Sequence, residues 1–552
     1  MKWLRRILKF FAWFLGFLIL VLLVLAIYMY SVADIAPPRV QDVPALRWIV
    51  QAEGTTRRIQ NNLLQKNKFG LYEMYLEGDA YTRGLVYGKL ASNLIRQQEL
   101  AFTNEIQRMI PSQRYLKFLK YLVGFMNRNL SDYVIQEYQE EIYGISQAAS
   151  QEFNWIGTNY SRQLNYHAAH DIGHALANMM LVGCTSFAAW DDASEDRGLI
   201  VGRNFDFYVG DEFAKDKIIA FYRPESGYPF ASVTWGGFTG VVSGMNNQGL
   251  SVTINAAKSS IPFGAATPVS LVAREILQYA SNIQEAFAIA SKRKMFVSES
   301  FLIASAKDHK AVVLEKTPDE LALFESTTNR IQCANHYQSN KLGPSELNQQ
   351  QMQSSASVYR YKRLTELLDQ SGPLSPQKTA KILRDYRGLG GSDIGLTNEK
   401  ALNQFIAHHA VIFEPEKGRM WVSTAPWQLG RMICYDLNRI FSSYGSEALH
   451  ADSLNDIAAD SILQTSTFQQ IQTYLRLEQA HIRHQKVDIP KLIASNPTYY
   501  DTWRIAGDQY RMQGQKDSAL KMYKQALLFE IATEDERMQL RQKIESLTNA
   551  RQ

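Results

Sequence analysis

The chain has 552 residues, of which 46% are hydrophobic and 20% are charged, and its formal net charge is +5. These values are ordinary for globular proteins, so extensive disorder is excluded, and the length predicts more than one domain. Because the positive excess is small and no basic stripe alternates with aromatic residues, we expect no nucleic-acid partner.

The N-terminus predicts a single membrane span. From Phe10 to Tyr30 the residues carry no charge and are almost all apolar, and a helix of ~20 such residues crosses a hydrocarbon core of ~30 Å. Basic residues precede the run, so we expect Met1 in the cytoplasm and everything after Ser31 outside, as in a periplasmic protein anchored in the inner membrane. A cleaved signal peptide is the alternative, but its apolar core is typically ~7–15 residues.

The texture of the sequence divides the chain into five segments. The linker contains three prolines and reads as extended, and the segment after it has a strand pattern at 71–76 and helical spacing from about 80 to 182. The segments are an anchor at 1–31, a linker at 32–50, a largely helical segment at 51–183, a strand-rich domain at 184–440 and a helical domain at 441–552.

Short β-rich runs separated by turn signals dominate the fourth segment. One helix is predicted at 268–292, and further helices at 355–370 and 376–386. Runs of hairpins with helices set apart indicate an α+β layered domain. The predicted strands are 186–190, 199–202, 218–222, 231–234, 240–243, 250–254, 301–304, 311–315, 410–414 and 419–423.

The C-terminal segment carries a pattern typical of one tetratricopeptide repeat at 496–530. Small residues at these positions let two antiparallel helices approach closely, and aromatic residues fill the seam. A groove that binds a protein partner and a helical cap on the neighbouring domain both remain open. The matching residues are Trp503, Gly507, Tyr510, Gly514, Ala519, Tyr523 and Ala526.

Three cysteines, Cys184, Cys333 and Cys434, cannot form a disulfide framework. They are either buried small hydrophobes or include a thiol kept free for chemistry. Gly183 precedes Cys184 and offers an unobstructed carbonyl. If the thiol attacked it, an N-to-S acyl shift and hydrolysis would leave Cys184 as a new N-terminus.

A terminal cysteine can supply both nucleophile and base. Its α-amine has a reference pKa of ~8 and its thiol ~8.5, so proton transfer between them is nearly thermoneutral. Arg203 could hold the thiolate by charge, and Asp206 could accept a hydrogen bond from the α-ammonium.

A series of motifs runs along the chain from Leu71 to Pro426. The motifs are Gly78-Asp-Ala-Tyr-Thr-Arg-Gly84, Gly88, Gly183-Cys-Thr-Ser-Phe187, Gly202-Arg-Asn-Phe-Asp206, Gly244-Met-Asn-Asn-Gln-Gly-Leu250, Asn255, Asn335-His336 and Ser357-Val-Tyr-Arg360. In these motifs and in their order this part of the chain resembles the N-terminal-nucleophile (Ntn) hydrolases of the choloylglycine hydrolase and acyl-CoA:6-aminopenicillanic acid acyltransferase type, the C45 peptidase group. The resemblance implies a four-layer αββα sandwich and autocleavage between Gly183 and Cys184.

The same resemblance implies a role for each catalytic residue. Cys184 is the nucleophile, with Arg203 beside it and Asp206 holding its amine. Asn255 is the side-chain donor of the oxyanion hole, and Asn335 orients the cysteine and the tetrahedral intermediate. Arg360 matches the family's distant arginine less securely, because Arg363 lies one turn further on. The family needs no cofactor and no metal.

The expected reaction is attack on an amide carbonyl, formation of a thioester and release to water or an amine. The anchor favours a lipophilic N-acyl amide, and because acyl-CoA is scarce outside the cytoplasm we favour hydrolysis or acyl exchange over CoA-dependent transfer. The rival is an inactive, membrane-tethered scaffold whose C-terminal helices dock a partner.

A histidine cluster is the remaining motif. His167, His170, Asp171 and His174 share one side of a predicted helix, so a metal site is geometrically possible. No fourth ligand is evident, and we expect these side chains to line the cleft or bond the backbone near Gly183. His408 and His409 receive a structural interpretation as well.

Overall fold

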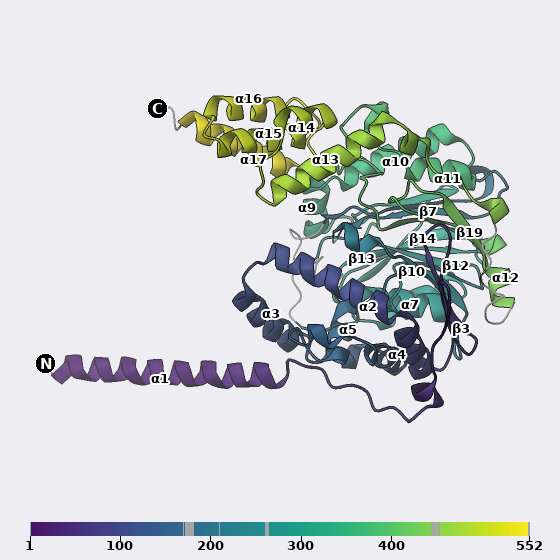
Figure 1. The fold of residues 1–552 in the computed structure, drawn as a ribbon, viewed down its shortest axis with the longest axis horizontal. Helices are drawn as coiled ribbons and strands as arrows, with labels where there is room; N and C mark the ends of the chain where they lie inside the picture. Colours follow the sequence, from purple (N-terminus) through teal and green to yellow (C-terminus); the bar gives the residue numbers. More distant parts are fainter. Residues whose placement is uncertain are drawn as a thin grey trace.

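The computed structural model describes residues 2–168, 171, 181–208, 210–259, 264–442, 449 and 453–549. A long helix, α1 (Lys2–Ser31), reaches away from a layered body, and the C-terminal helices gather at one end of that body (Figure 1). Within the described residues, α1 is the helix long and apolar enough to cross a membrane, and its side chains from Trp3 to Ser31 are not buried. By length and composition α1 is a membrane span or a signal sequence.

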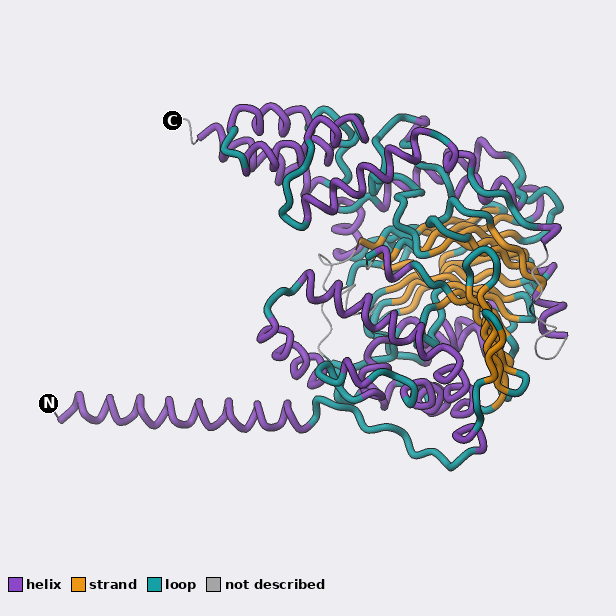
Figure 2. The backbone as a smooth tube through the Cα atoms, viewed as in Figure 1, coloured by secondary structure: helices purple, strands orange, loops and turns teal. Residues whose placement is uncertain are grey.

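Two large sheets form the centre of the body (Figure 2). In the described residues the larger sheet has eleven strands, antiparallel except that β4 runs parallel to β9. Its order is β1 (Gln51–Glu53), β2 (Thr56–Ile59), β3 (Asn62–Lys66), β4 (Tyr72–Gly78), β9 (Ile218–Pro224), β10 (Phe230–Thr234), β11 (Ser243–Asn246), β12 (Leu250–Ala256), β13 (Glu299–Ser305), β14 (Lys310–Lys316) and β15 (Leu321–Phe324).

The smaller sheet is antiparallel throughout, and a separate two-residue ladder flanks it. The sheet order is β16 (Arg330–Cys333), β6 (Thr185–Ala189), β7 (Ile200–Phe205), β17 (His409–Glu414), β18 (Arg419–Ser423) and β19 (Met432–Asp436), and the ladder joins β5 (Leu181–Val182) to β8 (Phe207–Tyr208).

Helices cover the outer faces of both sheets. On the larger sheet lie α2 (Ala80–Met109), α4 (Gln136–Ser146), α5 (Asn159–His167), α7 (Val269–Tyr279) and α8 (Ile283–Lys292); on the smaller lie α10 (Ser357–Ser371) and α11 (Pro376–Leu383). The remaining helices are α3 (Gln113–Met126), α9 (Glu346–Ser354), α12 (Leu437–Ser442), α13 (Ser466–Ile482), α14 (Ile489–Ser495), α15 (Tyr500–Met512), α16 (Lys516–Ala526) and α17 (Glu534–Asn549).

The hydrophobic core has three layers, which confirms the predicted αββα sandwich. Between the sheets, Phe221 and Val313 of the larger one pack with Val201 and Val411 of the smaller. A second cluster joins the larger sheet to α2 and α7, and a third joins the smaller sheet to α10 and α11. Alternate residues of each strand therefore face opposite cores, as the pleat requires.

Two local predictions differ from the structure. The segment predicted to be largely helical begins with β1–β3, which were not predicted, and with β4, which matches the strand expected at 71–76; together they form one end of the larger sheet. The helix predicted at 268–292 is two helices, because the chain leaves helical geometry at Ala280 and Asn282 caps α8 by accepting a hydrogen bond from the Glu285 amide.

A buried ion-pair cluster joins the segment before Gly183 to the strand-rich domain. Glu141 on α4 lies 2.6 Å from Arg83 on α2 and 2.7 Å from Arg274 on α7, and all three are buried. Removing one partner of such a cluster leaves an uncompensated buried charge. Together with the β4–β9 pairing, this cluster would hold the two parts together if the chain were cut after Gly183.

The C-terminal helices α15 and α16 pack closely as an antiparallel pair. A Cβ added at Gly507 would lie 2.4 Å from the Tyr523 ring, so glycine is needed there for close approach. The pair is fixed to the strand-rich domain by hydrogen bonds between Asn496 and the backbone of Leu396. Its assignment as a tetratricopeptide repeat stays a prediction.

Candidate active site

Cys184 lies between β5 and β6 and is fully enclosed. Its side chain is 1% exposed. Its Sγ lies 3.8 Å from an Arg203 guanidinium nitrogen and 3.9 Å from the Asp206 carbonyl oxygen. The Gly183 amide also donates to that carbonyl, at 3.1 Å. The peptide bond between Gly183 and Cys184 is thus held against the end of β7.

The sheet places Arg203 beside the sulfur. Arg203 lies opposite Ser186 in the β6–β7 ladder, and its guanidinium donates to the Ser243 hydroxyl and the Ile254 carbonyl, each at 2.5 Å. The guanidinium also stacks 4.3 Å above the centre of the Phe205 ring. These contacts immobilise a buried cation that faces the thiol.

Burial dominates the ionisation of the thiol. It raises the pKa of Cys184 to about 11, against the opposing effect of the Arg203 charge. Before any cut, the thiol is therefore protonated at neutral pH, and attack on a carbonyl requires a proton acceptor.

Asp206 carries a buried carboxyl group whose two oxygens have no hydrogen-bond partner among the described residues. Burial raises its pKa to about 7, while Arg360 and Arg203 act in the opposite direction. A buried acceptor of this kind is costly unless it is paired or protonated. The group is poised to take a proton or to meet a cation.

Asn335 and Arg360 form a second pair at the site. Arg360 donates to the Asn335 amide oxygen at 2.5 Å, and its charge acts on both Asp206 and Cys184. The neighbouring Arg363 instead pairs with Asp385 at 2.9 Å and with Glu366. The geometry thus places Arg360, rather than Arg363, next to the other predicted residues.

Asn255 is close to the site but its amide is already engaged. Its Nδ2 lies 3.2 Å from each of the Cys333 and Ala334 carbonyl oxygens, and its Oδ1 accepts from Ser186. To act as an oxyanion donor, the Asn255 amide must break its hydrogen bond to one of these two carbonyls.

Two buried polar residues at the site were not predicted from the sequence. Gln404 donates from Nε2 to the Gly183 carbonyl oxygen at 3.3 Å, and the Glu299 carboxylate has no hydrogen-bond partner among the described residues and feels the Arg203 charge. Neither stands in a recognisable motif. Glu299 lies at the start of β13, a strand in which every residue is buried.

The histidines have structural contacts where they are described. Both ring nitrogens of His167 are occupied, since one accepts a hydrogen bond from the Thr239 amide and the other bonds the Gln163 carbonyl. Burial lowers the pKa of this histidine to about 4. His170 and His174 lie outside the described residues. His409 bonds the Ser243 hydroxyl at 2.8 Å, and the same hydroxyl accepts a hydrogen bond from Arg203. His409 therefore helps to fix the position of Arg203.

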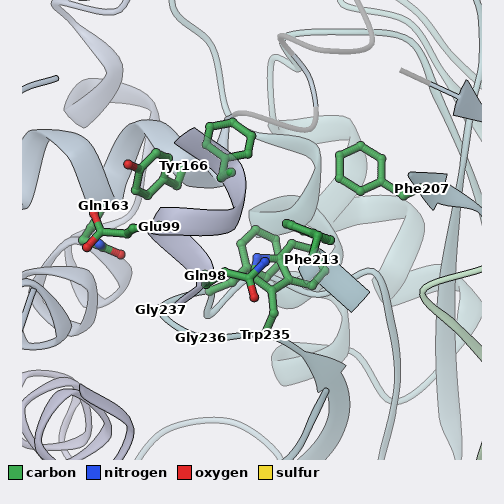
Figure 3. A pocket seen from close by; sticks show the side chains of 11 residues that line it. Gln98, Glu99, Gln163, Tyr166, Phe207, Phe213, Trp235, Gly236 and Gly237 are labelled. Atoms are coloured by element: carbon green, nitrogen blue, oxygen red, sulfur yellow. The ribbon is translucent and has the colours of Figure 1, made fainter. Parts of the chain in front are cut away.

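A small aromatic cavity is lined in part by Phe207, the residue that follows Asp206 (Figure 3). It has a volume of about 40 Å³, and Phe207, Phe213 and Trp235 form much of its wall, with Glu99 and Gln163 at the other side. Cys184 belongs to the same hydrophobic cluster as these aromatic rings.

A comparison with models of known protein families matches the middle part of the chain. Residues 193–426 match the model of the acyl-coenzyme A:6-aminopenicillanic acid acyl-transferase family. This range begins after Cys184 and includes Arg203, Asp206 and Asn335.

Three related proteins share parts of the sequence. An uncharacterized protein of Archaeoglobus fulgidus is 25% identical over 431 residues, 71% of this chain and 70% of that protein. The N-acylethanolamine-hydrolyzing acid amidase of Caenorhabditis elegans is 25% identical over 222 residues, 38% of this chain and 58% of that protein. Protein dcd1B of Dictyostelium discoideum is 20% identical over 261 residues, 46% and 52% of the two chains. The chain thus spans little more than half the length of the last two.

Two solved structures are also similar in part. The Caenorhabditis elegans N-acylethanolamine-hydrolyzing acid amidase ortholog has a TM-score of 0.30 at 17% identity, covering 42% of this chain and 93% of that one. A mutant of the conjugated bile acid hydrolase from Clostridium perfringens has a TM-score of 0.32 at 14% identity, covering 46% and 92%.

Proposed function

We propose that the protein is a self-cleaving cysteine enzyme of the Ntn acyl-amide hydrolase and acyltransferase type. Residues 193–426, which match the model of the acyl-coenzyme A:6-aminopenicillanic acid acyl-transferase family, support this proposal. Cys184 becomes a new N-terminus when the chain cuts itself after Gly183. The mature residue then attacks N-acyl amides and carries the acyl group as a thioester.

The unpaired Asp206 carboxylate is the observation that carries this proposal. It is buried beside Cys184 and has no hydrogen-bond partner among the described residues. A cut after Gly183 creates an α-ammonium group on Cys184, which is the partner that such a carboxylate lacks. A scaffold has no use for an unpaired buried acid at this place.

The contacts around Gly183 support a balanced sequence of steps for the cut. The Cys184 thiol loses its proton to the Asp206 carboxylate, and the sulfur attacks the Gly183 carbonyl carbon while Gln404 donates to the carbonyl oxygen. The C–N bond breaks, the Cys184 nitrogen takes up a proton and a thioester forms. Water then hydrolyses the thioester, which gives a Gly183 carboxylate and a free thiol.

The mature site repeats this chemistry on an external amide. The α-amine of Cys184 accepts the thiol proton and returns it to the departing amine, and Arg203 stabilises the thiolate. Asn335, fixed by Arg360, orients the intermediate. Asn255 serves as oxyanion donor after its side-chain amide breaks its hydrogen bond to the Cys333 or the Ala334 carbonyl.

The substrate we propose is a lipophilic N-acyl amide. The aromatic rings that share a hydrophobic cluster with Cys184 suit an apolar acyl group, and α1 supports anchoring in a membrane with the body on the extracytoplasmic side. One relative is named as an N-acylethanolamine-hydrolyzing amidase. We favour hydrolysis over CoA-dependent transfer, because acyl-CoA is scarce outside the cytoplasm.

Activity on a small panel of fluorogenic N-acyl amides tests the proposal. The purified full-length protein should release the fluorophore, and Cys184→Ala should not. Cys434→Ala is the matched control, because Cys434 is equally buried but lies in β19. Equal turnover by the wild type and Cys184→Ala would show that Cys184 is not the nucleophile, and no turnover by either favours the inactive scaffold.

A further inference from the structure

The largest of the described cavities lies between three parts of the chain. It has a volume of about 640 Å³, within the range of small-molecule sites. The end of α2 contributes Glu105, the strand-rich domain contributes Glu399 and Gln404, and the C-terminal helices contribute Phe468 and Leu475. In Figure 1 the C-terminal helices lie together beside α9 and α10.

We propose that this cavity admits the substrate to Cys184 and that α13, α15 and α17 form its outer wall, where they select the amine half of the amide. The inference rests on the proposed function and extends it. It gives the C-terminal segment a role in specificity within the enzyme itself.

Two residues of the cavity floor contact the site directly. Gln404 donates to the Gly183 carbonyl oxygen at 3.3 Å. The backbone carbonyl of Glu399 accepts from Arg360 at 3.0 Å, and Arg360 in turn holds Asn335. The cavity and the reactive cysteine are therefore separated by a single layer of residues.

Self-cleavage can open that layer. In the part of the chain that the structure describes, residues 181–182 pair with Tyr208 and Phe207 in a ladder of two residue pairs. Gly183 occupies the space between Cys184 and Gln404, since a Cβ added to Gly183 would lie 2.3 Å from the Gln404 amide. Once the bond after Gly183 is broken, the new Gly183 carboxylate can leave, and its place connects Cys184 with the cavity.

The wall contributed by the C-terminal helices suits a polar group better than an alkyl chain. Arg476, Arg504 and Glu536 line it together with Leu475. An alkyl chain laid against these charges would desolvate them without compensation, whereas a polar amine can bond them. Cys184 shares a hydrophobic cluster with Phe207, Phe213 and Trp235, and these rings suit the acyl half.

The wall is anchored firmly enough to shape a site. Asn398 donates to the Glu530 carbonyl at 2.9 Å, and Lys400 pairs with the Glu530 carboxylate at 2.5 Å. Across the cavity, burial and the Glu536 carboxylate raise the pKa of Glu399 to about 7. A site needs such support from surrounding contacts to discriminate between ligands.

Alkylation of Cys184 in the detergent-solubilised full-length protein tests the inference without a known substrate. The probes are iodoacetamide, which is small, and pyrenylmaleimide, which is bulky, with modification read by peptide mass spectrometry. Leu475→Trp should slow the bulky probe about tenfold and leave the small one unchanged. Phe468→Ala should accelerate the bulky probe. Gln470→Trp, exposed on the same helix and outside the cavity lining, should match the wild type.

Hydrolysis rates then assign the amine half. Dodecanoyl amides of glycine and of aminomethylcoumarin differ in the amine, and hexanoyl and dodecanoyl amides differ in the acyl chain. Leu475→Trp should change kcat/KM between the two amines and preserve the acyl-chain preference. If cleaved, active enzyme shows wild-type probe and amine ratios in both Leu475→Trp and Phe468→Ala, the inference is wrong and the proposed function stands. An uncleaved, inactive wild type overturns both.

Discussion

The side-chain amide of Gln404 donates a hydrogen bond to the carbonyl oxygen of Gly183, with 3.3 Å between the two atoms and both residues buried. They are 221 residues apart in the sequence. This is the carbonyl at which the proposed cut begins, so the donor stands where negative charge would develop.

Replacing Gln404 by leucine should slow self-cleavage by about 10²-fold, since loss of one oxyanion donor typically has this effect. Pulse labelling of newly made protein, followed by gel separation of the two fragments, measures the rate. Gln472→Leu is the control, because Gln472 lines the same cavity but has no bond to Gly183. Equal cleavage rates in the two variants would exclude Gln404 from the reaction.

Self-cleavage should depend on pH through Asp206. Its pKa is raised to about 7 by burial, so the carboxylate becomes available to accept the thiol proton only as the pH rises through that value. The cleavage rate of freshly refolded precursor should therefore increase from pH 5 to pH 8. In Asp206→Asn this increase should be absent. A step that persists in Asp206→Asn belongs to another group.

The same residue should influence the stability of the uncut chain. A carboxyl whose pKa is higher in the folded state than its ordinary 3.8 disfavours folding once it ionises, so stability falls as the pH rises from 4 towards 7. In the Cys184→Ala background, Asp206→Asn should raise the midpoint of urea unfolding at pH 8 and leave it unchanged at pH 4. A lower midpoint at pH 8 would show that the ionised carboxylate has a partner.

Arg274→Met should weaken the union of the two parts of the chain. It leaves Glu141 buried with one cation fewer, and losing one partner of a buried pair costs about 3–5 kcal/mol. Arg293→Met is the matched control, because its bond to Glu275 is partly exposed and contributes at most about 1 kcal/mol. Urea unfolding of both variants in the Cys184→Ala background compares the two costs.

Arg360 and Arg363 offer a direct comparison of two arginines one helical turn apart. Arg360→Lys loses the fork that reaches Asn335 and Glu399, so we expect kcat to fall at least tenfold. Arg363→Lys keeps a cation beside Asp385 and should retain wild-type kcat. The reverse order of effects would move the site arginine to position 363.

Local patterns in the sequence predicted most of the strands, whereas the αββα arrangement and the candidate site residues rested on the family resemblance. The strand run 301–304 lies inside β13, and Arg203 and Asp206 stand beside Cys184 because β6 and β7 are adjacent strands. Gln404 could not be predicted, since its position depends on how a loop far along the chain folds back. The break at Ala280 also escaped, because helical spacing continues through it while the cap at Asn282 restarts the helix.

The engagement of Asn255 illustrates the limit of carrying a role over from a family. Its place at the end of β12 agrees with the expected position, but hydrogen bonds to two backbone carbonyls occupy its amide in the uncut chain. A motif specifies which residue stands at a site, whereas its bonding depends on neighbours such as Cys333 that only the fold supplies.

N-terminal sequencing of the purified, folded protein tests the central claim most directly. The account predicts two fragments that stay associated, the larger beginning at Cys184, and a single uncut chain for Cys184→Ala. A folded, active wild-type protein in which the bond between Gly183 and Cys184 is intact would contradict it.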